Sequence, residues 1–228
     1  MAKIGMIGAG SWGTALSVLL ADNGHHVTIW SIDEKEVEML DKKREHLTKL
    51  PGVKLSDGMT ITGDLESAVK GKDFLVLAVP SPFTRATAKK MSAYVGKGQI
   101  IVDVAKGIEE NTLDTMTQII KEELPMAETA VLSGPSHAEE VSRGLPTLCV
   151  AGSHKKNIAE YICNVHVEGP YYLNFGDCSP LAGRCGAREY RFGQAVGSDA
   201  LQALAAADFR ADADPDHLQN PDGSTHIN

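Results

Sequence analysis

A glycine-rich loop near the start of the chain constrains the fold more than any other stretch. Gly8, Gly10 and Gly13 stand in G-x-G-x-x-G spacing between the apolar run Lys3–Ile7 and the apolar run Thr14–Ala21. In a strand–helix–strand unit the first glycine makes a tight turn, the second lets backbone approach a pyrophosphate, and the third lets the helix pack on the strand. The N–H groups and dipole at the helix start attract phosphate. The loop therefore predicts a dinucleotide site rather than a plain strand-to-helix turn.

Expected strands and helices alternate through the rest of residues 1–162, which predicts an α/β fold with a doubly wound parallel sheet. Because ligands bind beyond the carboxyl ends of the strands in such sheets, we expect the loops that begin at Gly8, Pro80, Lys106 and Ser133 to converge on one crevice. The expected strands are 3–7, 26–30, 59–61, 73–79, 99–104, 130–132 and 147–151, and the expected helices are 14–21, 33–40, 64–69, 84–94 and 112–123.

Charge and cysteine content exclude several classes of function. The net charge of −8 offers no basic surface for nucleic acid or an anionic membrane, so we expect no nucleic-acid partner. No apolar run reaches the length of a membrane span, and the first residues enter a strand without room for a signal peptide, which predicts a cytoplasmic protein without membrane insertion. The four cysteines show no C-x-x-C spacing, so we expect reduced thiols and no metal site.

Residue usage changes sharply near Cys163. All fifteen lysines and all seven methionines lie at or before Lys156, and residues 163–228 also lose the apolar period. We therefore divide the chain into a dinucleotide-binding domain over 1–162 and a short, irregular and foreign C-terminal tail over 163–228. Within this tail only Ala200–Ala207 is expected to be helical.

Four motifs in order closely resemble the NAD(P)-dependent glycerol-3-phosphate dehydrogenases of bacteria. The resemblance covers about residues 1–162 and implies a Rossmann-type cofactor domain, followed in the family by a helical substrate domain that the tail replaces here. It also implies NAD or NADP as cofactor and hydride transfer between dihydroxyacetone phosphate and sn-glycerol 3-phosphate, a step that feeds phospholipid synthesis. The motifs are Gly8–Ala15, Leu77–Ser81, Lys106–Glu109 and Ser133–Val141.

The resemblance also assigns roles to individual residues. It implies that Lys106 touches both cofactor and substrate, where a lysine can pair with a phosphate or polarise a carbonyl oxygen. Gly134 and Ser136 match substrate contacts. Cofactor contacts, including those expected from the glycine loop, are Gly8, Gly10, Ser11, Trp12, Gly13, Asp33, Lys106 and Ala138.

Several of these residues have a plainer alternative. Lys106 could be a solvated lysine at a strand end. Ser136 could be a helix N-cap that forms a capping box with Glu139. Trp12 could pack in the core, and His137 is expected to be a local hydrogen-bonding residue rather than an acid or base.

Two departures from the family pattern bear on chemistry. Where the family often has an arginine beside a 2′-phosphate, this chain has Ser31–Asp33, and an acid there can take a ribose hydroxyl instead. Lys35 could replace the arginine, so the choice between NAD and NADP stays open. The family's general base is a lysine in a Gly-Gly-Ala-Leu-Lys-Asn segment, and no lysine follows Lys156. We therefore assign no catalytic residue.

The sequence thus predicts a glycerol-3-phosphate dehydrogenase that is weak or inactive as this chain. The alternatives are a catalytically dead dinucleotide-binding module, or another small-substrate dehydrogenase of the ketopantoate or 3-hydroxyacid type. The sequence leaves a homodimer open.

We expect the 163–228 tail to be a frameshifted reading of the family's helical domain. An out-of-frame sequence has no selected apolar periodicity, so it cannot bury enough apolar surface to offset the conformational entropy lost on folding. Shifting the DNA frame after the codon for Ile162 should uncover a Gly-Gly-Ala-Leu-Lys-Asn-like segment, and the repaired protein should oxidise glycerol 3-phosphate. The absence of that segment from every frame, or turnover by the 228-residue chain, would contradict this expectation.

Overall fold

The computed structural model describes residues 1–134, 136–145, 147–166 and 172–177. The strands are β1 (Lys3–Ile7), β2 (His26–Trp30), β3 (Glu45–His46), β4 (Leu50–Lys54), β5 (Thr60–Thr62), β6 (Phe74–Leu77), β7 (Ile100–Asp103), β8 (Glu128–Ser133), β9 (Leu148–Ser153) and β10 (Tyr172–Asp177). The helices are α1 (Ser11–Asp22), α2 (Glu34–Lys43), α3 (Leu65–Val69), the 3₁₀ helix η1 (Ser81–Phe83), α4 (Thr84–Met91), α5 (Met116–Glu123), α6 (Ala138–Val141) and α7 (Lys156–His166).

Eight of the described strands form one sheet in the order β10-β9-β8-β7-β6-β1-β2-β5. From β5 to β8 every pair is parallel, which confirms the predicted Rossmann-type α/β sheet. The last residues of β1, β6 and β7 lie in register, with Ile7 opposite Leu77 and Leu77 opposite Asp103, while Asp103 lies opposite Val131, two residues before the end of β8. Their carboxyl ends therefore share one edge of the sheet.

One end of the sheet departs from the parallel arrangement. Strand β9 runs antiparallel to β8, with Ser133 opposite Val150, and β10 runs parallel to β9. Consequently the amino end of β9 lies beside the carboxyl end of β8. Strands that run antiparallel to the rest are common at the edges of large, mostly parallel sheets.

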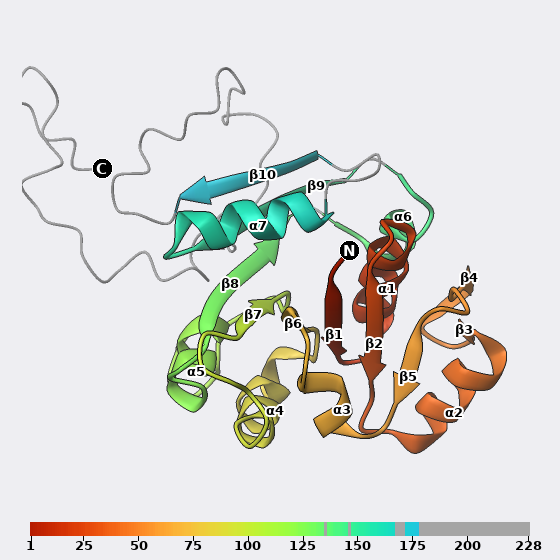
Figure 1. Cartoon of the computed structure of the whole chain (residues 1–228), viewed down its shortest axis with the longest axis horizontal. Helices are drawn as coiled ribbons and strands as arrows, with labels where there is room; N and C mark the ends of the chain where they lie inside the picture. Colours follow the sequence, from red (N-terminus) through yellow and green to blue (C-terminus); the bar gives the residue numbers. More distant parts are fainter. Residues whose placement is uncertain (135, 146, 167–171, 178–228) are drawn as a thin grey trace, which may run out of the picture.

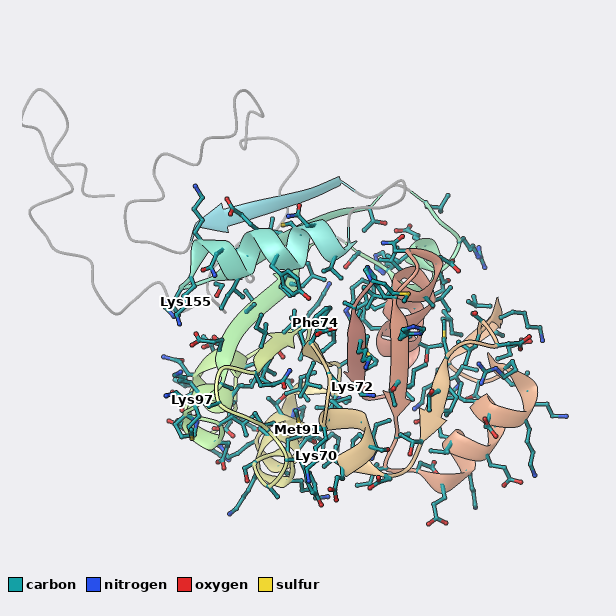
Figure 2. All side chains as sticks on the ribbon, viewed as in Figure 1. Lys70, Lys72, Phe74, Met91, Lys97 and Lys155 are labelled. Atoms are coloured by element: carbon teal, nitrogen blue, oxygen red, sulfur yellow. The ribbon has the colours of Figure 1, made fainter. Side chains whose placement is uncertain are left out.

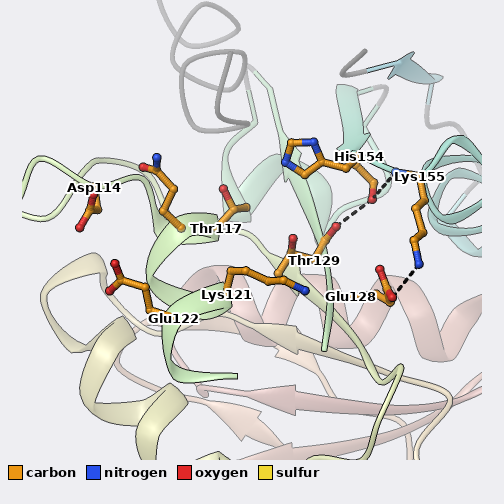
Figure 3. Close-up of a pocket in the computed structure, with 10 residues that line it drawn as sticks. Asp114, Thr117, Lys121, Glu122, Glu128, Thr129, His154 and Lys155 are labelled. Carbon is orange, nitrogen blue, oxygen red and sulfur yellow. Dashed lines mark hydrogen bonds and ion pairs between the residues drawn. The ribbon is translucent and has the colours of Figure 1, made fainter. Parts of the chain in front are cut away.

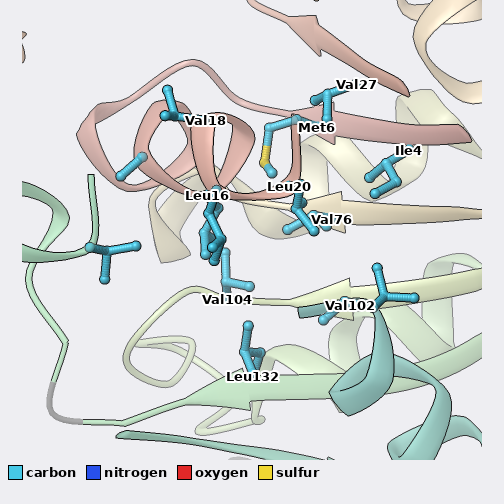
Figure 4. Packing of buried hydrophobic residues seen from close by; sticks show 14 of the residues in the cluster. Ile4, Met6, Leu16, Val18, Leu20, Val27, Val76, Val102, Val104 and Leu132 are labelled. Atoms are coloured by element: carbon cyan, nitrogen blue, oxygen red, sulfur yellow. The ribbon is translucent and has the colours of Figure 1, made fainter. Parts of the chain in front are cut away.

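Helices cover both faces of the sheet (Figure 1), and alternating side chains fill the core on each side. On one face, Met6 and Val76 pack beneath α1, α6 and α7, and Figure 4 shows Leu16 and Leu20 of α1 over these strands. On the other face, Ile7 and the neighbouring strand residues pack against α3, α4 and α5.

Helix α7 is held on the first of these faces partly by an aromatic pair. Phe74 of β6 is fully buried, and its ring meets that of Tyr161 edge to face, with centroids 5.9 Å apart. In Figure 2, Phe74 lies in the sheet close to the α7 ribbon. Edge-to-face geometry is favoured by the ring quadrupoles. This contact and the buried Ile162 anchor α7 to the sheet.

Three helices start where local hydrogen bonds place them. Asp33 and Asp64 cap α2 and α3, as their acidic side chains allow. The expected helix 112–123 begins later, at Met116, because Thr115 and Gln118 form a capping box. Leu113, which lies within the expected range, instead has φ +62° and is exposed.

Regular structure also occurs where the sequence predicted none. A β3–β4 hairpin follows α2, helix α7 continues through residue 163 to His166, and β10 adds a further strand. The expected irregular tail is therefore wrong for 163–166 and 172–177. The assignment of 163–228 as a foreign segment stays a prediction, and the expected helix 200–207 lies outside the described residues. Within the described ranges, none of the helices is long and apolar enough to cross a membrane.

Candidate functional site

The glycine loop joins β1 to α1, and two of its three glycines leave no room for a side chain. Gly8 has φ +119°, and a methyl group at this position would lie 2.7 Å from the carbonyl oxygen of Ala78. A methyl group at Gly13 would lie 2.1 Å from the carbonyl oxygen of Gly8. Gly10 differs, since a methyl group there would meet nothing within 4 Å. Two glycines are thus required by packing, and the third faces empty space.

The first N–H groups of α1, at the end of this loop, have no partner within the helix. Gly10 is the N-cap of α1, and no side chain in the described part of the protein caps this helix, in contrast to α2, α3 and α5. Ser11 and Trp12 form the first turn, and the half-buried Trp12 also packs against the core. A helix start of this kind attracts phosphate through N–H groups and dipole. The residues present therefore fit a pyrophosphate.

The loops after β6 and β7 meet beside the glycine loop. Ala78, which follows β6, contacts Gly8 and Gly13, and the hydroxyl of Ser81 lies 3.4 Å from where a Cβ of Gly107 would be. Gly107 has φ +115° and directly follows the exposed Lys106. The loops that begin at Gly8, Pro80 and Lys106 therefore lie together at this edge, while the expected crevice stays a prediction.

An arginine clamp holds the segment that follows Lys106. Arg85 of α4 donates two hydrogen bonds to Glu109, Nε to Oε1 at 2.8 Å and Nη2 to Oε2 at 2.7 Å. This fork geometry fixes both groups. The Arg85 guanidinium lowers the pKa of Glu109 to about 2, so the clamp stays charged at neutral pH. It ties the Lys106 loop to α4.

The loop after β8 reaches the same edge. Ser136 is buried and donates a 3.3 Å hydrogen bond to the carbonyl oxygen of Gly134, which is also buried. Burial raises the pKa of the nearby Cys149 thiol to about 11, against smaller lowering by a hydrogen bond with Ser136 and by the charge of Lys106. Lys106, Ser136 and the amino end of β9 therefore lie close together.

The capping-box alternative for Ser136 is wrong. The N-cap of α6 is His137, which is exposed and makes no side-chain capping bond, and Ser136 bonds Gly134 instead. Ala138 is buried at the first position of α6, and α6 packs against α1. The loop after β8 thus lies next to the helix that begins at the glycine loop.

Asp33 lies one strand further along the same edge. The backbone N–H of Gly8 donates to the carbonyl oxygen of Trp30, the last residue of β2, at 3.0 Å. Asp33 follows three residues later, is exposed, and accepts from the N–H of Lys35 through Oδ1 at 2.9 Å. The structure thus arranges the predicted residues along one edge, from Asp33 through the glycine loop to Lys106 and Ser136.

Sequence reasoning missed Asp103, the last residue of β7. Its side chain is fully buried, Oδ1 accepts from the N–H of Ala105 at 3.3 Å, and Oδ2 has no hydrogen-bond partner among the described residues. Burial raises the pKa of Asp103 to about 8, against a smaller lowering by the Ala105 N–H. The only signal was a carboxylate that ends an apolar strand three residues before Lys106.

A cavity of about 610 Å³, lined by polar and charged residues, lies away from this edge. It is bounded by α5 and by Glu128 and Thr129 at the beginning of β8 (Figure 3). Its lysines already have partners, since Lys155 pairs with Glu128 at 2.7 Å and Lys121 donates to the carbonyl oxygen of Ala127. We therefore place the candidate site at the glycine loop. No group of three or more His, Cys, Asp or Glu suited to a metal ion occurs in the described ranges.

Comparison with known families finds a match over most of the described chain. Residues 3–159 match the family model described as NAD-dependent glycerol-3-phosphate dehydrogenase N-terminus. The chain is 60% identical over 162 residues to a glycerol-3-phosphate dehydrogenase [NAD(P)+] of Agathobacter rectalis, covering 71% of this chain and 48% of the relative. It is 52% identical over 167 residues to that of Fusobacterium nucleatum, covering 72% and 50%. The chain thus spans about half the length of these curated relatives.

Solved structures give the same grouping. The fold matches a crystal structure of glycerol-3-phosphate dehydrogenase from Coxiella burnetii with a TM-score of 0.73 and 25% identity, covering 76% of this chain and 53% of that one. The match to a glycerol-3-phosphate dehydrogenase structure from yeast, with a TM-score of 0.68 and 21% identity, supports the fold alone.

Proposed function

Because the chain belongs to the NAD-dependent glycerol-3-phosphate dehydrogenase family, we propose that residues 1–162 bind NAD or NADP as the cofactor half of such an oxidoreductase. The observation that carries this proposal is the uncapped first turn of α1, reached across Gly10, which has no atom within 4 Å of its Cβ position. Backbone N–H groups there suit a pyrophosphate. When bound, the nicotinamide cofactor supplies or accepts the hydride.

The proposed division of roles follows the edge of the sheet. Ser11 and Trp12 would hold the pyrophosphate through their backbone N–H groups, and Asp33 would face the adenosine ribose. Ala138, at the start of α6 beside α1, would lie against the cofactor. Gly8 and Gly13 would act through shape, since each is pressed against neighbouring backbone.

The proposed substrates are dihydroxyacetone phosphate and sn-glycerol 3-phosphate. Lys106 would pair with the phosphate or polarise the carbonyl oxygen, where negative charge develops as hydride adds. Gly134 and Ser136 would contact the substrate from the loop after β8. Turnover by this chain alone is expected to be weak or absent, because the sequence has no lysine after Lys156 to supply the family's general base.

The substrate proposal predicts that Lys106→Met weakens binding of glycerol 3-phosphate to the NAD-loaded chain. Loss of a charge-assisted hydrogen bond should reduce the affinity by at least about tenfold. Calorimetry measures this, with Lys97→Met as a matched control, because Lys97 is exposed in the turn that precedes β7, at the opposite end of that strand. Equal substrate affinity of the Lys106 variant and the parent chain would remove Lys106 from the site.

The exposed carboxylate of Asp33 predicts that NADH binds at least as tightly as NADPH. A carboxylate can accept hydrogen bonds from a ribose hydroxyl but repels a 2′-phosphate. Titrations of both cofactors test this prediction. A clear preference for NADPH that disappears in Lys35→Met would instead assign the 2′-phosphate to that lysine.

A further inference from the structure

A buried polar cluster lies behind the turn that carries Asp33. The carboxylate of Glu36, in the first turn of α2, accepts from the hydroxyl of Ser31, from Nε2 of His46 at 2.9 Å and from Nζ of Lys49 at 2.5 Å. Ser31 is 5% exposed, Glu36 9% and His46 1%. The cluster thus joins the end of β2, helix α2 and the β3–β4 hairpin.

The direction of each hydrogen bond in this cluster follows from its neighbours. The backbone N–H of Lys49 donates to Nδ1 of His46 at 3.2 Å, so Nδ1 carries no proton and Nε2–H donates to Glu36. The hydroxyl of Ser31 accepts from the backbone N–H of Asp33 at 3.2 Å, which leaves its own hydrogen for Glu36. Asp33 is therefore connected to Glu36 through a single side chain.

The charge of Glu36 is maintained at this buried position. Burial raises the pKa of Glu36, but hydrogen bonds from Lys49, Ser31 and His46 together outweigh it and lower the pKa below its ordinary value. The side chain of Lys49 is 52% exposed, so of this ion pair only the Glu36 carboxylate is taken out of water. Glu36 therefore remains a charged hydrogen-bond acceptor for the hydroxyl of Ser31.

We infer that Glu36 is a positioning residue for the adenosine end of the cofactor, acting through Ser31 to fix the turn that presents Asp33. The inference rests on the proposed function, because it takes Asp33 as the group that faces the ribose. Ser31 follows β2 directly, and its backbone N–H donates to the carbonyl oxygen of Thr62 at 3.2 Å, so its position is fixed by the sheet. With Ser31 so placed, its hydroxyl sets the N–H direction of Asp33.

A double-mutant cycle tests this coupling. Glu36→Gln should weaken NADH binding by about tenfold, the usual scale for one hydrogen bond to a charged group. It should change NADPH binding much less, so the ratio of the two affinities should shift toward NADPH. In an Asp33→Asn background, Glu36→Gln should cause no further loss of NADH affinity, because its effect passes through Asp33.

Matched controls separate positioning from folding. Glu38→Gln removes an exposed carboxylate of the same helix, whose partner Lys42 lies 2.5 Å away, and should leave both cofactor affinities unchanged. Ser31→Ala removes only the link to Asp33 and should reproduce the loss seen in Glu36→Gln, which keeps the test open if Glu36→Gln does not fold. Circular dichroism confirms that each variant is folded before titration.

The outcomes distinguish this inference from the proposed function. If the parent chain binds NADH and Asp33→Asn weakens binding, but Glu36→Gln and Ser31→Ala do not, the positioning role is wrong and the proposed function stands. Additive losses in the cycle would also overturn the positioning role. If the folded parent chain does not bind NADH, the proposed function fails and the inference fails with it.

Discussion

Gly10→Val is expected to abolish cofactor binding and leave the protein folded, whereas Gly13→Val is expected to destabilise the fold. A side chain at Gly10 meets no protein atom within 4 Å, and its backbone angles of −63° and 178° suit any residue. The stability should change by less than about 1 kcal/mol. The new side chain would fill the space in front of the α1 N–H groups, so cofactor affinity should fall by more than about 100-fold.

The Gly13 variant provides the contrast. Even a Cβ at this position would lie 2.1 Å from the carbonyl oxygen of Gly8, so the loop or the helix must move. Overpacking against backbone should cost about 3 kcal/mol, which lowers the melting temperature by roughly 10 °C in a protein of this size. Thermal denaturation of both variants and calorimetry on the folded one measure these effects. Tight cofactor binding by Gly10→Val would place the pyrophosphate elsewhere.

Asp103→Asn is expected to become progressively more stable than the parent chain as the pH rises from about 4 to about 8. The folded-state pKa of Asp103 is raised from 3.8 to about 8, so the folded protein keeps a proton that the unfolded chain loses in this range. The unfolding free energy of the parent then falls by about 1.4 kcal/mol for each pH unit, whereas that of the asparagine variant does not change through this residue. Below pH 4 both states of the parent hold the proton, and the difference disappears.

Urea denaturation of both proteins at pH 5, 6, 7 and 8 measures the difference in unfolding free energy. The pKa shift of Asp103 sets an upper limit on this difference. We expect the unfolding free energy of the variant to exceed that of the parent by a margin that grows with pH to the order of a few kcal/mol. If the unfolding free energies of the two proteins change by the same amount with pH, the raised pKa of Asp103 is wrong. Asp57→Asn is the matched control, because Asp57 is exposed whereas Asp103 is buried. This substitution should not change how the unfolding free energy varies with pH.

The parts of the fold that were predictable from sequence depend on local patterns. Strand β1, the glycine turn and α1 follow from spacing within about twenty residues, and Gly8 and Gly13 carry the packing that their positions imply. The later start of α5 also had a local signal, because Thr115 and Gln118 stand in capping-box spacing. The apolar residues that precede Thr115 concealed it.

Other features depend on contacts that sequence spacing does not encode. The period of β9 marks a strand but not its direction, so its antiparallel pairing with β8 was not predicted. Helix α7 has apolar Ile158, Ile162 and Val165 at helical spacing, yet the change in residue usage near 163 obscured this pattern. The β3–β4 hairpin was not predicted, and its strand β4 contains Pro51, which is tolerated because both strands of a two-stranded sheet are edges.

The candidate site also contains residues that local motifs predict and residues that only tertiary contacts bring together. Lys106, Gly134 and Ser136 were predicted as site residues because family motifs mark them, and their loops lie along one edge of the sheet. Glu36 and His46 are ten residues apart and become partners only when the β3–β4 hairpin folds back over α2.

A calorimetric titration of NADH into the 228-residue chain tests the central claim most directly. The site at the glycine loop predicts saturable binding at a single site per chain, absent in folded Gly10→Val. A folded parent chain that binds neither NADH nor NADPH at about 1 mM, the top of the usual range for enzyme ligands, would contradict the assignment of this edge as a cofactor site.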